Sequence, residues 1–158
     1  MYQLLKKELT LFSPINGRKI DLDKVPDKVF SSYMMGTGLG FINESNKIYA
    51  PCNATVIMIA DTKHAIGLKT KMGVEILIHI GLDTIQLMGK GFHVHVKNKE
   101  KIKKGDLLIS YDKKFIEDKH MDLTIPMVIT NSNDYDIKFL NESKEVTLNS
   151  EVIKVLRR

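Results

Sequence analysis

Short runs of β-branched and aliphatic residues recur along the chain and are separated by Gly, Asn, Asp and Pro. Many short apolar runs at this spacing are typical of a β-sandwich or barrel. A helical pattern is found only at 112–121, and 26–35 has room for a turn or two. We therefore predict an all-β fold, an antiparallel β-sandwich or flattened barrel with one or two short helices. The predicted strands are 9–12, 18–22, 39–43, 47–50, 55–60, 65–70, 74–80, 106–110, 125–130, 146–148 and 152–156.

The segment 74–81 alternates strictly between two kinds of position. One face of the predicted strand is entirely β-branched, and we expect it to face the core. The core-facing set is Val74, Ile76, Ile78 and Ile80. Leu77 and His79 fall on the opposite face, so His79 is expected to project away from this core immediately before Gly81.

A hairpin is predicted to join 65–70 to 74–80, and it brings two histidines together. If the turn centres near 70–72, His64 lies opposite His79 on the neighbouring antiparallel strand. Their Cβ atoms would then be roughly 4.5–5.5 Å apart. Thr62 lies two residues before His64. We therefore expect a histidine pair with a hydroxyl beside one member.

This trio suits one kind of chemistry. A neutral imidazole is a good nucleophile near neutral pH, and one ring nitrogen stays free when the other donates a hydrogen bond. The second imidazole could donate to an anion carried by the first, and Thr62 could hold that second ring in the required tautomer. Such a layout is appropriate for phosphoryl transfer, in which the protein mainly positions the groups and neutralises oxygen charge.

Length and composition place all 158 residues, 43% of them hydrophobic, in a single domain spanning 1–158. The 24 basic and 19 acidic residues give a net charge of +5, which raises the question of nucleic acid. However, the lysines are dispersed, and the densest stretch, 97–104, reads as a solvated loop. No basic stripe is interleaved with aromatic residues, so we expect no nucleic-acid partner.

The single cysteine, Cys52, cannot form a disulfide within the chain, which fits a reducing compartment. No apolar run approaches the ~18 residues that span a membrane. The first eight residues are too short and too charged for a signal peptide. We therefore expect a cytoplasmic protein with no direct insertion into the membrane.

The residues around His79 also resemble a known family. The sequence VEILIHIGLDT at 74–84, followed by GKGF at 89–92, is similar to the active-site signature of the glucose-type IIA component of the bacterial phosphoenolpyruvate:sugar phosphotransferase system. The resemblance runs from about residue 13 to the C-terminus. Shorter matches lie at 25–30, 62–65, 104–106 and 126–131.

The resemblance implies a β-sandwich phosphotransferase component that works through a covalent phosphohistidine and needs no cofactor or metal. His79 would accept a phosphoryl group through Nε2 from the histidine-containing phosphocarrier protein, HPr. The group would then pass to a cysteine on the IIB domain of a membrane sugar permease. His64 would contact the phosphoryl oxygens, and Thr62 would orient His64.

The resemblance further implies which residues bind these partners. Asp27 and Asp83 occupy positions that meet arginine on the phosphocarrier protein. A carrier that serves two proteins needs an exposed site in a shallow apolar depression. The apolar residues at or near the matching positions are Val29, Phe30, Met34, Met35 and Leu77.

An alternative is a zinc-dependent hydrolase of similar β architecture. His93 and His95 form a His-x-His pair, and alternation along a strand places both rings on one face, where they could chelate a metal. A catalytic zinc also needs a third protein ligand, and no compact His-x-x-x-Asp motif precedes the pair. A carrier domain of the biotinyl or lipoyl type is a weaker alternative, because 69–72 matches its modified hairpin poorly.

Overall fold

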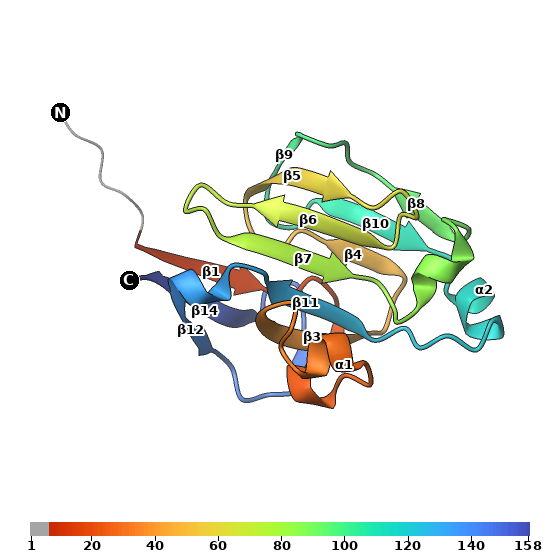
Figure 1. Ribbon diagram of the computed structural model, residues 1–158, viewed down its shortest axis with the longest axis horizontal. Coiled ribbons are helices and arrows are strands. Elements are labelled where there is room, and N and C mark those ends of the chain that lie inside the picture. The colour runs from red at the N-terminus through yellow and green to blue at the C-terminus, as the bar shows by residue number, and fades with distance from the viewer. Residues whose placement is uncertain (1–6) are drawn as a thin grey trace.

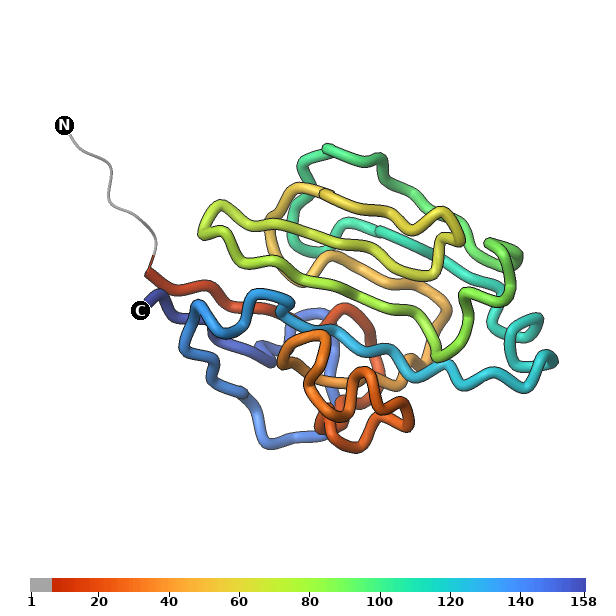
Figure 2. Tube along the Cα trace, in the orientation of Figure 1, coloured from red at the N-terminus to blue at the C-terminus, as the bar shows by residue number. Residues whose placement is uncertain are grey.

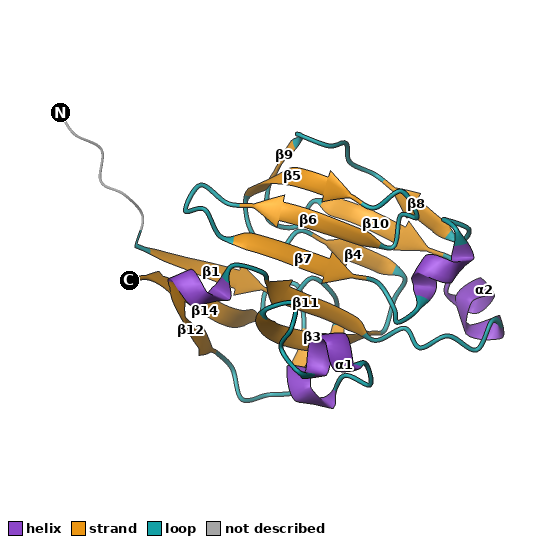
Figure 3. Cartoon of the chain, in the orientation of Figure 1, coloured by secondary structure: helices purple, strands orange, loops and turns teal. Residues whose placement is uncertain are grey.

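The computed structural model describes residues 7–158, and strands make up most of its regular structure (Figures 1 and 3). The predicted all-β class is confirmed. The strands are β1 (Glu8–Phe12), β2 (Gly17–Asp21), β3 (Thr37–Asn43), β4 (Lys47–Tyr49), β5 (Ala54–Ile59), β6 (Ala65–Lys69), β7 (Glu75–His79), β8 (Phe92–Val94), β9 (Lys101–Ile102), β10 (Leu107–Tyr111), β11 (Ile125–Ile129), β12 (Tyr135–Phe139), β13 (Glu145–Val146) and β14 (Glu151–Arg157). The helices are α1 (Lys28–Ser31), α2 (Lys113–Asp118) and the 3₁₀ turns η1 (Leu22–Lys24), η2 (Thr84–Leu87) and η3 (Ser132–Asp134).

Three antiparallel sheets build the sandwich. The largest has eight strands in the order β13-β2-β3-β11-β7-β6-β5-β9, and two three-stranded sheets have the orders β4-β10-β8 and β1-β14-β12. Figure 1 shows β4 and β10 behind β5, β6 and β7, with β1 and β14 continuing the layer beside them. β7 therefore occupies the interior of the large sheet, hydrogen-bonded on both edges.

The two faces of β7 pack into different apolar clusters, as its alternation requires. Ile76 and Ile78 point into the main core between the sheets. Leu77 points the other way, into a smaller cluster with Phe30 and Val128. η1 and α1 cover this second face, and Figure 1 shows α1 in front of the strands there. The end of β7 that carries His79 consequently lies between the main core and this covering segment.

The structure also contains elements that the pattern did not predict. β12 was missed, although Tyr135, Ile137 and Phe139 alternate along it, because its intervening residues are charged and it pairs with only one strand. β9 lies inside 97–104, which was expected to be a loop. α2 begins after Asp112, whose carboxylate caps the helix by accepting a hydrogen bond from the Phe115 backbone. It ends at Asp118, earlier than predicted, and His120 beyond it has a positive φ of 60°.

No helix among residues 7–158 is both long enough and apolar enough to cross a membrane. The expectation that the first eight residues are no signal peptide falls mostly on 1–6, which lie outside the described residues.

Candidate active site

The predicted hairpin forms, but its register is one residue away from the expected one. His79 pairs with Ala65: the five residues 70–74 connect the two strands, and Gly73 takes a positive φ of 89° near the end of this connection. The expected alignment of His64 opposite His79 was therefore wrong. Instead, the His64 carbonyl accepts a hydrogen bond from the Ile80 backbone at 2.7 Å.

The two imidazoles nevertheless meet, because β6 begins only at Ala65 and the chain before it turns. Lys63 has a positive φ of 61°, which directs His64 toward the end of β7 rather than along the strand. The ring centroids of His64 and His79 lie 4.7 Å apart at an interplanar angle of 75°. The ring of Phe30 lies 5.2 Å from His79 in an edge-on arrangement. His79 is thus held between an imidazole and a phenyl ring.

The backbone after β7 fixes the orientation of the His79 ring. His79 Nδ1 lies 2.7 Å from the carbonyl oxygen of Gly81, which can only accept. Nδ1 therefore carries the proton, and Nε2 of the neutral ring holds a free lone pair. Gly81 has a φ of 79°, and a Cβ there would lie 2.6 Å from Cγ2 of Thr84. Only glycine places this carbonyl correctly without displacing the loop.

His64 is the more enclosed ring, with 6% of its surface exposed. Its Nδ1 lies 2.6 Å from the hydroxyl oxygen of Thr62. When Thr62 donates to Nδ1, the neutral ring carries its proton on Nε2. His64 then becomes a hydrogen-bond donor beside the free nitrogen of His79.

The environment keeps both rings neutral near pH 7. Burial lowers the pKa of His79, against the opposing effects of the Gly81 carbonyl and of the Asp27 and Asp83 charges. Burial also lowers the pKa of His64, and a positive charge on His79 lowers it further, while the Thr62 backbone acts in the opposite direction. A neutral imidazole is the form that attacks an electrophile.

Asp27 and Asp83 lie near enough to His79 to act on its charge. Asp27 begins α1, where its carboxylate accepts a hydrogen bond from the Val29 backbone at 2.9 Å. Asp83 precedes η2 with a φ of 61° and makes no capping hydrogen bond with its side chain. Both carboxylates favour a positive charge on the His79 ring.

The structure divides the five expected apolar contact residues into two groups. Val29, Met34 and Met35 are exposed at 44%, 76% and 37%. Phe30 and Leu77 are buried, with only 4% and 9% of their surface exposed, and they lie in the smaller cluster beneath His79. Phe30 and Leu77 support the site from below, because η1 and α1 cover that face. Their contact with a partner protein stays a prediction.

Three further exposed apolar residues flank the site and were missed from the sequence. Ile85 and Met88, on and after η2, are exposed at 55% and 76%, and Met58 of β5 at 38%. A Cβ on Gly67 would come within 3.3 Å of the Met58 Cβ, so the Met58 side chain lies over this glycine. We call the exposed set the apolar rim: Val29, Met34, Met35, Met58, Ile85 and Met88. An apolar residue in a turn gives no periodic signal, so the sequence pattern does not predict that Ile85 and Met88 are exposed.

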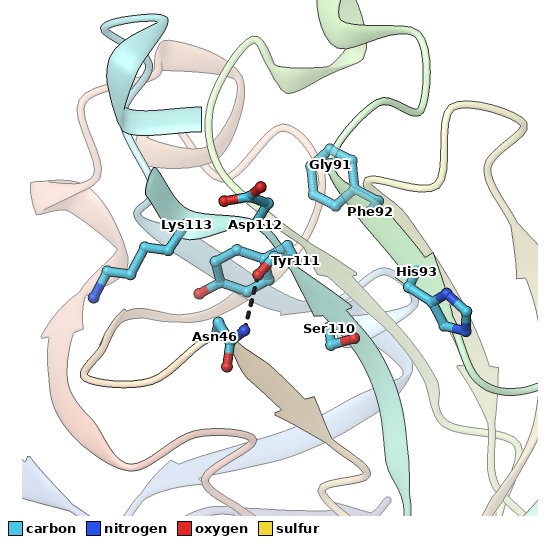
Figure 4. A pocket seen from close by; sticks show the side chains of 8 residues that line it. All are labelled: Asn46, Gly91, Phe92, His93, Ser110, Tyr111, Asp112 and Lys113. Atoms are coloured by element: carbon cyan, nitrogen blue, oxygen red, sulfur yellow. Dashed lines mark hydrogen bonds between the residues drawn. The ribbon is translucent and has the colours of Figure 1, made fainter. Parts of the chain in front are cut away.

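His93 and His95 share a face of the chain, as the alternation predicted, with ring centroids 4.5 Å apart. His95 Nε2 lies 2.8 Å from the Ser110 hydroxyl. Figure 4 shows His93 at one side of a cavity of about 480 Å³, apart from Asp112. Among residues 7–158, no group of three His, Cys, Asp or Glu side chains is placed to hold a metal. The zinc-hydrolase alternative gains no support from this geometry.

The family model for the phosphoenolpyruvate-dependent sugar phosphotransferase system, EIIA 1, matches residues 9–135. The chain belongs to this family. The resemblance found in the sequence is thereby confirmed. The EIIA match includes Asp27, Thr62, His64, His79 and Asp83, whose arrangement is described above.

Named relatives agree with this membership. A glucose-specific EIIA component of Staphylococcus epidermidis is 40% identical over 127 residues, covering 80% of this chain and 76% of the relative. A glucose-specific EIIBCA component of Corynebacterium glutamicum is 41% identical over 143 residues, which are 90% of this chain and 21% of the relative. The EIIA chain thus spans about a fifth of such multi-component relatives.

A solved structure shares the fold. Glucose permease IIA from Mycoplasma capricolum superimposes with a TM-score of 0.88 at 35% identity, covering 97% of this chain and 99% of the other. This likeness agrees with the β-sandwich assignment.

Proposed function

We propose that this EIIA chain is a phosphohistidine carrier of the sugar phosphotransferase system. It accepts a phosphoryl group from phospho-HPr on His79 and delivers it to a cysteine on the IIB domain of a glucose-type permease. The observation that supports this most directly is the 2.7 Å contact between His79 Nδ1 and the Gly81 carbonyl, which leaves Nε2 free. We place this activity in the cytoplasm, where HPr and the IIB domain would meet it.

The loading step needs no proton transfer by His79. The Nε2 lone pair attacks phosphorus, the phosphorus–nitrogen bond of phospho-HPr breaks, and its electron pair returns to the donor ring. His79 then carries phosphate on Nε2 and a proton on Nδ1, so its ring is positively charged. The Gly81 carbonyl and the charges of Asp27 and Asp83 stabilise this state.

The unloading step reverses these changes with a different acceptor. A cysteine thiolate of the IIB domain attacks phosphorus, the bond to Nε2 breaks, and the electron pair returns to His79. With the proton kept on Nδ1, the ring departs as a neutral imidazole, which is a better leaving group than the imidazolate anion that would form without it. His64, when it donates from Nε2, neutralises phosphoryl oxygen charge during both transfers.

The surroundings fit transient docking of two different proteins. Asp27 and Asp83 offer negative charge to arginines of HPr, which favours association and orientation. The apolar rim supplies the exposed area that excludes water during transfer, and methionine adapts its shape to more than one partner.

The test is reconstitution from phosphoenolpyruvate, enzyme I and HPr. We expect one acid-labile, base-stable phosphate on the wild-type chain and none on His79→Ala. His64→Ala should still accept phosphate but pass it on slowly, and His93→Ala, on an exposed strand away from the site, serves as the matched control. Normal phosphorylation of His79→Ala would refute the assignment.

Delivery is tested separately with extracts that lack their own IIA activity. Addition of the EIIA chain should restore phosphorylation of glucose by the membrane fraction, whereas His79→Ala should not. Failure with every glucose-type permease tested, despite normal loading by HPr, would refute the proposed acceptor.

A further inference from the structure

A second cavity, of about 820 Å³, lies at the opposite end of the β6–β7 hairpin from the two histidines. Its walls come from β1, β5, β9, the end of β6 and residues 70–72 of the turn that follows β6. In Figure 2 this turn lies on the side of the molecule where β1 begins. The volume falls within the range of roughly 300–1,000 Å³ typical of small-molecule sites. The phosphoryl-transfer chemistry makes no use of this cavity.

The inner wall of the cavity is apolar and recessed. Cys52, Met72 and Ile102 are exposed by only 4%, 6% and 3%. The other apolar residues of the lining are Leu9, Phe12, Ala54 and Ile57, of which Ile57 is 43% exposed. Burial raises the pKa of the Cys52 thiol to about 12, so the thiol stays protonated and adds no negative charge. The interior therefore favours an uncharged, hydrophobic group.

The rim of the same cavity is strongly basic. Five lysines line it, and no acidic side chain does. Among residues 7–158, only Lys69 of the five has a carboxylate within 4.0 Å, that of Glu75. The Lys104 ammonium lies 4.3 Å from the centre of the Phe12 ring, at the boundary between the basic rim and the apolar wall. The lysines are Lys69, Lys71, Lys101, Lys103 and Lys104.

We propose that this cavity binds a small amphiphilic anion, in which an apolar chain carries a terminal carboxylate. The apolar part would lie against Met72 and Ile102, and the carboxylate would lie among the lysines. Clustered cations at the mouth of a concave site attract anions and raise their local concentration. A membrane surface is disfavoured, because an interfacial segment inserts protruding apolar side chains, whereas Cys52, Met72 and Ile102 of this wall are recessed. This binding is independent of the proposed phosphoryl transfer.

The experiment is a titration with dodecanoate, followed by calorimetry and by methyl NMR. We expect saturable binding of one ligand, with shifts at Ile57, Met72 and Ile102 and none at Ile85 near the histidines. Dodecyltrimethylammonium, which has the same chain and the opposite charge, should bind at least about tenfold more weakly, because the rim is basic.

Charge reversal at exposed positions provides the matched variants. Lys71→Glu combined with Lys101→Glu should weaken dodecanoate binding by about tenfold or more. Lys114→Glu combined with Lys138→Glu changes the net charge equally on exposed sites outside the cavity and should leave binding unchanged. Both variants should accept phosphate on His79 at the wild-type rate, which also reports that they fold.

Three outcomes would overturn the proposal. Equal affinity for the two surfactants would show that the lysines play no part. Binding to vesicles of anionic phospholipid, without saturable binding of dodecanoate, would assign the surface to membranes. If inorganic phosphate bound as tightly as dodecanoate, the alkyl chain of the ligand would add nothing to affinity, and the apolar wall would have no role.

Discussion

Thr62→Val tests whether the Thr62 hydroxyl sets the tautomer of His64. Valine keeps nearly the same shape but cannot donate to Nδ1, which lies 2.6 Å from the hydroxyl oxygen. His64 is only 6% exposed, so the nitrogen loses its partner in a setting where water replaces it poorly. An unsatisfied buried polar group costs about 1–3 kcal/mol. If the whole cost is felt in the transition state, transfer slows roughly 5- to 150-fold.

The assay is rapid-quench measurement of phosphoryl transfer from phospho-HPr to the chain and from the chain to a IIB domain. Thr62→Ser is the control, because it retains the hydroxyl and should stay close to the wild-type rate. Nitrogen NMR of the His64 ring supplies the second readout: the proton should move from Nε2 toward Nδ1 in Thr62→Val only. Unchanged rates and an unchanged ring spectrum would refute this reasoning and indicate that the Thr62 backbone holds the ring instead.

Three other predictions concern stability and reactivity. Gly81→Ala should lower the melting temperature more than Gly105→Ala; both glycines have positive φ, which costs alanine about 1–2 kcal/mol, but only at Gly81 would the Cβ crowd its neighbours. A lower melting temperature for Gly105→Ala than for Gly81→Ala, measured by calorimetry, would contradict this prediction. Because burial lowers the pKa of His64 and His79, the unfolded chain takes up protons first as the pH falls through 6.5. Urea titrations should show that the free energy of unfolding decreases below that pH, and that it decreases less steeply with pH in His64→Gln. An equal pH dependence in His64→Gln and the wild type would show that His64 does not contribute to it. Cys52 should react slowly with iodoacetamide in the folded chain and rapidly in urea, since its pKa is raised to about 12; fast native labelling would contradict its burial.

The sequence was most informative where periodicity and burial agree. β7 was predicted because its two faces alternate without interruption, and its neighbours followed from apolar runs of strand length. β12 was harder to recognise, because Asp136 and Lys138 are as compatible with a surface loop as with an edge strand. Edge strands bury one side only, so their pattern carries less information.

The site was predictable in its composition but less so in its geometry. The histidine pair was inferred through a register that proved one residue wrong, because the position of the turn depends on backbone conformation, such as the positive φ of Gly73, rather than on side-chain polarity. The burial of Phe30 and Leu77 depends on η1 and α1 folding over the sheet. That contact joins segments far apart in sequence, and no local pattern encodes it.

The hydrogen bond from His79 Nδ1 to Gly81 has a kinetic consequence. A ring tied to its own loop presents one nitrogen in one direction. Under the proposed function, donor and acceptor proteins must therefore occupy the same face in turn. Steady-state rates should follow ping-pong kinetics, with each partner acting as a competitive inhibitor of the other at high concentration. Such a carrier cannot be unloaded until its donor has left, nor reloaded until its acceptor has left.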